Sequence, residues 1–347
     1  MKRDIIAVDL FCSVGGLTRG LLDAGIKVKK GYDIDKKAKE TYERNNKGAT
    51  FIGKDICDLS TIELIEGLDL KNNFFLLAGC APCQPFSTIN NNSDSKDERR
   101  NLILKFAKLI KETKPDFVFM ENVPGLAGQK GEHIFKEFLQ VLDKEEFEYD
   151  YDVLNVKDFG VPQNRKRLVL IASKLGPINL PIKTHGLGKK PYLTVRDVIS
   201  KYPSLLAGEK HKRIPNHECR SLSNTNKERI RYISKDGGSR TDLPNRLILK
   251  CHKNHQGHKD VYGRMRWEDV SPTLTCKCIS ISNGRFAHPE QDRGISIREA
   301  ATIQTFPEKY IFYGNITNAT KWVGNAVPVK FARVFGEHFI KSNNWAI

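Results

Sequence analysis

Two residues with reactive side chains follow apolar segments of the chain. Cys83 stands between two nearby prolines, shortly after the apolar run Phe74–Cys80. Glu121 directly follows a second apolar run, Phe117–Met120. A thiolate is a strong nucleophile, and a carboxyl group among apolar residues holds its proton more readily, so the two together favour covalent acid–base chemistry. A small buried cysteine and a structurally paired acid are the plain alternatives.

The elements that must position these groups alternate between strand and helix. Period-two or continuous apolar runs predict strands, and period-3.6 patterns with helix stop signals predict helices. The predicted strands are Ile5–Phe11, Lys27–Asp33, Thr50–Gly53, Phe74–Cys80, Phe117–Met120, Tyr149–Val156 and Arg167–Ala172. The predicted helices are Gly16–Ala24, Lys36–Asn46, Leu102–Thr113, Glu132–Leu142, Ile297–Gln304 and Val327–Ile340. This alternation is typical of an α/β protein with an open, doubly wound and mostly parallel sheet.

Polar groups stand where the predicted strands end. The turn Cys12–Gly16 follows the first strand, Asp33 ends the second and Asp55 follows the third. Ligands bind beyond the carboxyl ends of such strands, and an acid about 20 residues after the turn is expected to bind a ribose. The turn is not G-x-G-x-x-G, and the sequence has no Walker motif. A ligand with adenosine but no pyrophosphate therefore fits, and S-adenosylmethionine is the commonest such ligand on this fold class.

The cysteines and apolar segments exclude other classes. Eight cysteines without a second C-x-x-C pair predict free thiols rather than a disulfide framework. Cys251, His252, His255 and His258 form the one cluster with metal-ligand chemistry, and we expect a solvated basic loop there rather than zinc. No apolar run approaches the roughly 18 residues of a membrane span, and none near the start is long enough for a signal peptide. We therefore expect a soluble, cytoplasmic chain without a bound metal.

The positive charge is concentrated in one part of the chain. The 347 residues carry a net charge of +16. Residues 174–275 hold 21 Lys and Arg against nine Asp and Glu, and thus most of that excess. This segment is also rich in Pro, Gly, His and Asn and lacks long periodic runs. We expect a second, smaller, irregular domain that binds nucleic acid, although a lysine-rich surface is the plain alternative.

The sequence resembles the DNA (cytosine-5) methyltransferase family over nearly its whole length. Six ordered motifs carry the resemblance: Asp9-Leu10-Phe11 with Gly15-Gly16; Pro82-Cys83-Gln84; Glu121-Asn122-Val123; Gln163, Arg165 and Arg167; Arg266 with Pro272, Thr273 and Thr275; and Arg298-Glu299-Ala300 with Gly324-Asn325-Ala326-Val327-Pro328. The resemblance implies a Rossmann-like methyltransferase sheet and a target-recognition domain. The implied boundaries are 1–180 for the cofactor-binding catalytic domain, 181–295 for recognition, and 296–347 returning to the catalytic domain.

The resemblance also implies roles for individual residues. Cys83 would attack C6 of cytosine, Glu121 would hold N3 and N4, and Arg165 would bind the O2 edge. Gln84, Asn122 and Arg167 complete the implied catalytic set. The residues implied to contact S-adenosylmethionine are Phe11, Gly15, Gly16, Asp33, Ile34, Asp55, Ile56, Leu102 and Asn325. The run Lys227–Arg231 and Arg240 are expected to meet phosphates, with a solvated helix face as the plain alternative. Three residues depart from the usual pattern, namely Ser13 in place of Gly, Asp33 in place of Glu and Ile34 in place of an aromatic residue.

The function implied is methylation of C5 of a cytosine in a specific double-stranded DNA sequence, on a flipped-out base. The resemblance favours a monomeric bacterial or phage modification enzyme, for which a restriction endonuclease of the same site is a candidate partner. The alternative is an RNA (tRNA) cytosine-5 methyltransferase, which the long basic segment disfavours. A non-catalytic DNA-binding relative is disfavoured because Cys83, Glu121 and Arg165 are all present. An NAD oxidoreductase is disfavoured by the missing third glycine of the turn.

Overall fold

The computed structural model describes residues 3–82, 100–129, 131–253 and 260–343. The chain forms two compact units. The first comprises residues 1–159, 166–183 and 327–347, and we call it the sheet unit. The second comprises residues 160–165 and 184–326, and we call it the loop unit. Each unit is described by itself.

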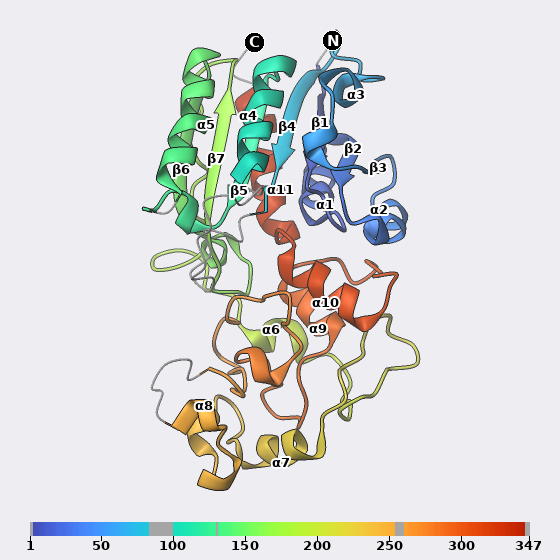
Figure 1. Ribbon diagram of the computed structural model, residues 1–347, viewed down its shortest axis with the longest axis vertical. Coiled ribbons are helices and arrows are strands. Elements are labelled where there is room, and N and C mark those ends of the chain that lie inside the picture. The colour runs from blue at the N-terminus through green and yellow to red at the C-terminus, as the bar shows by residue number, and fades with distance from the viewer. Residues whose placement is uncertain (1–2, 83–99, 130, 254–259, 344–347) are drawn as a thin grey trace. The chain divides into compact units, whose positions relative to one another are not determined.

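A seven-stranded sheet organises the sheet unit (Figure 1). Its strands are β1 (Ile5–Leu10), β2 (Lys27–Asp33), β3 (Thr50–Gly53), β4 (Phe74–Gly79), β5 (Phe117–Asn122), β6 (Glu148–Asn155) and β7 (Lys166–Ser173). Their order is β3-β2-β1-β4-β5-β7-β6, and β7 runs antiparallel to both neighbours. The strand order reverses between β1 and β4, which is where ligands bind in doubly wound sheets. The predicted α/β class and mostly parallel sheet are confirmed.

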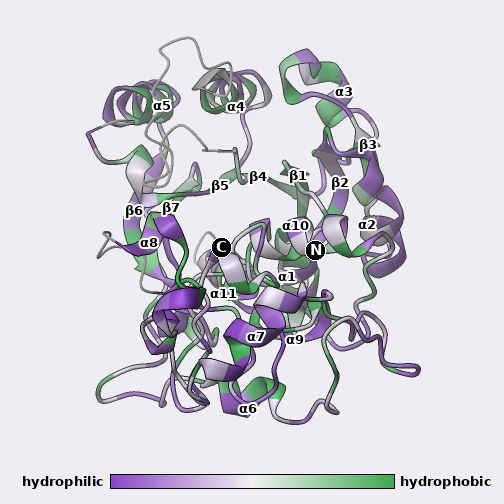
Figure 2. Ribbon diagram, turned by 60° about the horizontal axis from the view of Figure 1, so that its bottom comes forward, coloured by the Kyte–Doolittle hydropathy of each residue, from purple (hydrophilic) through white to green (hydrophobic). Residues whose placement is uncertain are grey.

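Helices cover both faces of this sheet. They are α1 (Gly16–Ala24), α2 (Lys39–Asn45), α3 (Thr61–Ile65), α4 (Arg100–Thr113), α5 (Glu132–Lys144) and α11 (Val329–Asn343). α4 and α5 lie together on one face (Figure 1). Figure 2 shows hydrophilic and hydrophobic residues on both of these helices, as expected for amphipathic helices on a sheet. α1 and α11 pack closely because Gly20 has no side chain; a Cβ there would lie 2.5 Å from the Cβ of Ala332.

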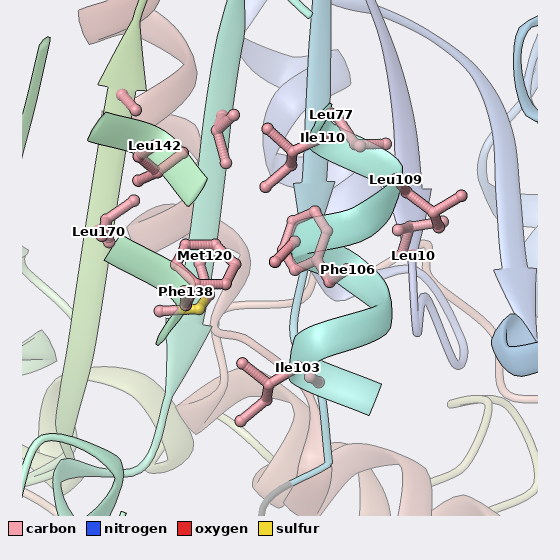
Figure 3. Close-up of a cluster of buried hydrophobic side chains, with 14 of the residues drawn as sticks. Leu10, Leu77, Ile103, Phe106, Leu109, Ile110, Met120, Phe138, Leu142 and Leu170 are labelled. Carbon is pink, nitrogen blue, oxygen red and sulfur yellow. The ribbon is translucent and has the colours of Figure 1, made fainter. Parts of the chain in front are cut away.

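The alternation of side chains along β5 fills the core on both faces. Val118 and Met120 point into the cluster with α4 and α5, which Figure 3 shows around Phe106 and Phe138. The intervening Phe119 packs on the opposite face, with its ring 5.2 Å from that of Phe335 in α11. Both faces of the strand are buried, so it reads as a continuous apolar run. This arrangement fixes the strand whose last two residues are Glu121 and Asn122.

Two short elements differ from the prediction for the sheet unit. The predicted helix Lys36–Asn46 is divided, because a 3₁₀ turn at Lys36–Ala38 precedes α2. The side chain of Asp35 accepts from the Lys37 amide and caps this tighter turn. The five-residue helix α3 was not predicted, although Ser60 and Glu63 form a capping box at its start.

The loop unit contains short helices and irregular chain. Its helices are α6 (Val195–Ile199), α7 (Asn224–Tyr232), α8 (Lys250–Lys253), α9 (Ile297–Ile303) and α10 (Ile316–Asn325). Its described residues form no strand, only isolated bridges such as those between Gln163 and Ser271 and between Arg264 and Ala287. The sequence predicted this irregular character and the helix α9, but it did not predict α6, α7, α8 or α10.

Residues 296–326 belong to the loop unit, whereas the predicted boundary placed them with the catalytic domain. α9 packs against α6 and α10. The guanidinium of Arg298 is buried and donates to the carbonyls of Pro215 and Tyr310. These contacts fasten the segment to irregular chain of the loop unit. Only the closing helix α11 returns to the sheet unit.

Candidate active site

The turn after β1 is held in an uncommon backbone conformation. Phe11, Ser13 and Gly15 have φ values of 62°, 46° and 84°, all in the left-handed region. Such values are costly for residues other than glycine and occur most often at functional turns. A Cβ on Gly15 would lie 2.5 Å from Asn46 Nδ2, so the turn also packs too tightly for a side chain there. The turn leads directly into α1, which begins at the predicted Gly16.

Asp33 fastens this turn to the end of β2. One carboxylate oxygen accepts from the Ser13 amide at 2.8 Å, and the other accepts from the Asp35 amide at 2.7 Å. The side chain is half-buried, and the neighbouring Ile34 is 69% exposed. The predicted ribose-binding acid therefore lies at the predicted turn. Its role toward a cofactor stays a prediction.

Asp9 is a buried acid of this region that the sequence analysis did not assign to the site. Its Oδ2 accepts from both the amide and the hydroxyl of Thr18 in the first turn of α1, and that hydroxyl lies 2.9 Å from the Tyr42 hydroxyl. Its Oδ1 has no hydrogen-bond partner among the described residues. Burial raises the pKa of Asp9 from its ordinary value to about 7, and the Asp33 carboxylate adds to the rise while Thr18 opposes it. The sequence signal that could have identified Asp9 is an acidic residue within the apolar run of β1.

Glu121 lies at the end of β5 beside an arginine of the adjacent strand. It is 7% exposed, and its Oε1 lies 2.8 Å from Nε of Arg167 in β7. That oxygen is without a hydrogen bond of good geometry among the described residues, so the contact is an ion pair rather than a well-aligned hydrogen bond. Of the predicted catalytic residues, these two are brought together within the sheet unit.

Asn122 connects the acid strand to the segment that precedes Cys83. Its Nδ2 donates to the Ala81 carbonyl at 3.2 Å, and its Oδ1 accepts from the Val123 amide at 2.8 Å. The backbone is thereby fixed two residues before the predicted nucleophile. Cys83 and Gln84 themselves lie outside the described residues.

The neighbouring thiols are poor candidates for the nucleophile. Burial raises the pKa of Cys80 well above its ordinary value, and the Glu121 carboxylate raises it further. Burial also raises the pKa of Cys12, together with the carboxylates of Asp9 and Asp33. A protonated thiol is a weak nucleophile. These environments disfavour Cys80 and Cys12 as nucleophiles. The C-x-x-C spacing of Cys80 and Cys83 in the sequence had not excluded Cys80.

The remaining predicted cofactor residues of the sheet unit differ in their surroundings. Asp55 accepts from the Cys57 amide at 2.8 Å and so caps a short 3₁₀ turn. Ile56 belongs to the buried core, and Leu102 in α4 is half-buried. Phe11 packs partly against the same core. Their predicted contacts with the cofactor stay predictions.

Two predicted site residues belong to the loop unit. Arg165 is buried, and its Nη1 donates to the carbonyls of Leu274 and Gly324 at 3.0 and 3.1 Å. Asn325 is the last residue of α10 and is exposed. Gln163, from the same motif as Arg165, is buried and hydrogen-bonded to Gln304.

The basic surface of the loop unit is smaller than its composition suggests. Lys227 and Arg231 are exposed on α7, four residues apart. Arg229 instead donates to the Leu247 carbonyl and lies over the ring of Tyr262. Arg240 is buried, so the structure does not support its predicted contact with phosphate.

No group of three or more His, Cys, Asp or Glu that could hold a metal occurs among the described residues. The candidate zinc ligands His255 and His258 lie outside them. Within the same described ranges, every helix is too short or too polar to cross a bilayer.

Comparisons with known proteins identify the family. The model of the C-5 cytosine-specific DNA methylase family matches residues 5–341. The Type II methylase M.HgiDII of Herpetosiphon aurantiacus is 40% identical over 95% of this chain and 93% of its own length. The Type II methyltransferase M1.HphI of Haemophilus parahaemolyticus is 31% identical over 97% and 87% of the two chains.

A solved structure supports the fold. The crystal structure of a prophage-encoded DNA modification methyltransferase from E. coli aligns with a TM-score of 0.71 over 98% of this chain and 100% of that one, at 22% identity. The ordered motifs, the sheet that places Glu121 beside Arg167, and the family match over nearly the whole length lead to one conclusion. This chain belongs to the C-5 cytosine-specific DNA methylase family.

Proposed function

We propose that this methyltransferase transfers a methyl group from S-adenosyl-L-methionine to C5 of a cytosine in a specific double-stranded DNA sequence, through a covalent bond between Cys83 and C6. The observation that carries the proposal is the end of β5. There a buried Glu121 lies 2.8 Å from Arg167, and the adjacent Asn122 holds the Ala81 carbonyl, two residues before Cys83. An acid, a cation and the base of the nucleophile segment thus converge at one strand end.

The proposed chemistry overcomes the low nucleophilicity of C5. The Cys83 thiolate adds to C6 while the Glu121 carboxyl group donates a proton at N3. The resulting enamine carbon C5 takes the methyl group from the sulfonium donor, which leaves as a neutral thioether. A base then removes the C5 proton, elimination releases Cys83 as a thiolate, and the N3 proton returns to Glu121. A target within a duplex must first leave the base stack, at a cost of a few kcal/mol.

The contacts of the two arginines divide their roles. Nη1 of Arg165 is engaged by two backbone carbonyls, whereas Arg167 contacts the predicted acid directly. We therefore propose Arg167, rather than Arg165, as the group that offsets charge at the O2 edge of the base. We propose that Arg165 holds the backbone at Leu274 and Gly324 in place.

The strained turn and its acid fit the proposed cofactor. The turn with left-handed Phe11, Ser13 and Gly15, the N-terminus of α1 and the Asp33 carboxylate lie together after β1 and β2. We propose that Asp33 binds the ribose hydroxyls and that the exposed Ile34 contacts the adenine. When bound, S-adenosylmethionine supplies a methyl group on a sulfonium centre. The turn lacks the third glycine that a pyrophosphate-containing cofactor requires.

The basic composition of residues 174–275 and the names of the similar proteins support duplex DNA as the substrate. We propose that the loop unit recognises the target sequence and that the enzyme is a cytoplasmic monomer. We also propose a restriction endonuclease of the same site as its cellular counterpart.

Mechanism-based trapping tests the covalent step. In DNA with 5-fluorocytosine at the target, C5 carries fluorine in place of the proton that must leave. The fluorine is not removed by a base, so the covalent adduct with the enzyme persists. Wild-type enzyme with S-adenosylmethionine is expected to form a complex that survives boiling in detergent. Cys83→Ser is expected to form none, because a hydroxyl ionises far less than a thiol. Cys80→Ser is the matched control and still traps, and Glu121→Gln traps slowly.

Two results would overturn this assignment. Trapping by Cys83→Ser together with loss of trapping in Cys80→Ser would mean that the nucleophile is wrong. Absence of trapping on DNA that the enzyme demonstrably methylates would exclude the covalent step. Methylation assays on duplex DNA and on total tRNA separate the proposal from the RNA alternative, and bisulfite sequencing of DNA from an expressing host gives the target.

A further inference from the structure

The C-terminal end of α10 is capped by two side chains from distant parts of the loop unit. Nε2 of Gln304 donates to the carbonyls of Val323 and Ala326 at 2.7 and 3.2 Å. Nη1 of Arg165 donates to the Gly324 carbonyl at 3.1 Å. The last carbonyls of a helix lack partners within the helix, and a cation is favoured at that end. Gln304 and Arg165 therefore replace the hydrogen bonds that α10 cannot make for itself.

The same two side chains are tied to each other through Gln163 and Leu274. Oε1 of Gln304 accepts from Nε2 of Gln163 at 2.8 Å, and Oε1 of Gln163 accepts from the Leu274 amide at 2.9 Å. Arg165 donates to the Leu274 carbonyl at 3.0 Å. Gln163, Arg165 and Gln304 are all buried. A buried network of this kind is rigid, because each broken bond would leave a polar group unsatisfied.

Asn325 lies between the carbonyls that this network holds. Its neighbours on both sides accept hydrogen bonds from the network, while its own side chain is exposed. The backbone before it is also packed tightly, because a Cβ on Gly324 would lie 1.8 Å from the Thr275 carbonyl oxygen. The structure thus fixes the backbone on each side of Asn325 and leaves its amide at the surface.

We propose that Gln304 is a positioning residue for cofactor binding. It holds the carbonyls of Val323 and Ala326, and with Arg165 it presents the Asn325 amide in the orientation that the methyl donor requires. The inference rests on the proposed function and on the contact with S-adenosylmethionine that the resemblance to the family implies for Asn325. A merely structural Gln304 would change stability without changing the affinity of the folded enzyme for its cofactor.

The test is a double-mutant cycle read by calorimetric titration of S-adenosylmethionine into the full-length enzyme. Gln304→Met keeps the side-chain length but makes none of the three hydrogen bonds. We expect Gln304→Met and Asn325→Ala each to raise the Kd about tenfold, the effect of losing roughly one well-placed hydrogen bond. Gln304→Met combined with Asn325→Ala is expected to show no further loss, because Gln304 acts through Asn325.

Gln291→Met is the matched control. Gln291 is an amide of the same unit whose Oε1 accepts from the Leu205 amide and from Nε of Arg293, neither of which belongs to α10. This variant is expected to lose stability while binding the cofactor with the wild-type Kd. If Gln304→Met does not fold, Gln304→Glu replaces it, since a buried, protonated Glu keeps one donor and an acceptor for Gln163. Its expected rise in Kd is about threefold, corresponding to a partial loss of hydrogen bonding.

The outcomes separate this inference from the proposed function. An unchanged Kd in folded Gln304 variants, with a raised Kd in Asn325→Ala, overturns the positioning role alone. Losses that multiply in the double variant overturn it as well, because the two residues would then act independently. An unchanged Kd in Asn325→Ala removes the proposed cofactor contact, and the positioning role fails with it, while trapping by Cys83 is unaffected.

Discussion

The two units solve the same problem, the burial of polar backbone, by different means. In the sheet unit the ladder from β3 to β6 pairs the amides and carbonyls, and the side chains are left to fill an apolar core. The described residues of the loop unit have no such ladder. There, buried guanidinium groups donate to carbonyls of irregular chain.

Arg264 is the clearest instance of a buried guanidinium that holds irregular chain together. It is completely buried and donates to the carbonyls of Ile233, His288, Gln291 and Ile230 as well as to the Asp292 carboxylate. Arginine offers five donors in a fixed planar fork and does not lose its charge, so one side chain can satisfy several loops at once. An arginine-rich segment is therefore not all binding surface, because part of its charge is internal structure.

The largest expected effect tests this internal use of arginine. Arg264→Met leaves four backbone carbonyls of the loop unit without this donor, and we expect a loss of about 3–5 kcal/mol in the free energy of unfolding. Trp267 and Trp322 both lie in the loop unit, so urea unfolding can be followed by their fluorescence. Arg266→Met is the control, because Arg266 is exposed two residues away. Equal stability of the two variants would show that the guanidinium does not hold the loops.

A pH-dependent effect is expected in the sheet unit. The pKa of Asp9 in the folded chain, about 7, lies above its unfolded value of about 4. The folded state therefore keeps a proton that the unfolded state loses, and stability falls as the pH rises from about 4 to about 7. Asp9→Asn should remove this loss, which the shift puts at up to ~4 kcal/mol.

The measurement for Asp9 is the free energy of unfolding of both proteins by circular dichroism at several pH values between these limits. Asp4→Asn, which removes an exposed carboxylate of the same unit, controls for the change in net charge. Parallel pH profiles for wild type and Asp9→Asn would contradict the prediction.

Asp33 separates cofactor binding from DNA binding. Asp33→Ala removes the proposed ribose ligand and the tether to the Ser13 amide, and we expect a rise of about tenfold in the Kd for S-adenosylmethionine. The DNA affinity of the cofactor-free enzyme should stay nearly unchanged. Asp35→Ala, which removes the side-chain cap of the neighbouring 3₁₀ turn, is the control. Equal losses of cofactor and DNA affinity would make Asp33 structural.

The smallest expected effect concerns the exposed charges of α7. If Lys227 and Arg231 contact phosphates, replacing each with Gln should lower the slope of log affinity against log salt by about 1. The wild-type affinity should itself fall steeply between roughly 50 and 200 mM salt. Lys136→Gln on α5 of the sheet unit is the control and should leave the slope unchanged. A flat wild-type salt dependence would exclude the basic segment as the DNA-binding part.

Much of the sheet unit could be predicted from the sequence, because its signals are local. Apolar runs gave the strands, and Gly25 and Pro115 marked helix ends. The polar residues Asp33 and Glu121 stood out against the strands that they end. Parallel strands bring their carboxyl ends to one edge, so strand assignment alone predicted that the turn and these acids share an edge.

Only the tertiary structure decided the pairings between residues distant in sequence. The ion pair of Glu121 with Arg167 depends on β7 lying beside β5 in antiparallel register, which periodicity does not specify. The capping of α10 by Gln304 and Arg165 depends on loops that follow no repeating pattern. The sequence by itself determined the strands, the α/β class, the motifs and the resemblance to the family. Packing decided which arginine contacts Glu121 and which arginines are buried inside the loop unit. The sequence could not decide this, because an arginine gives the same sequence signal whether its guanidinium is buried or exposed.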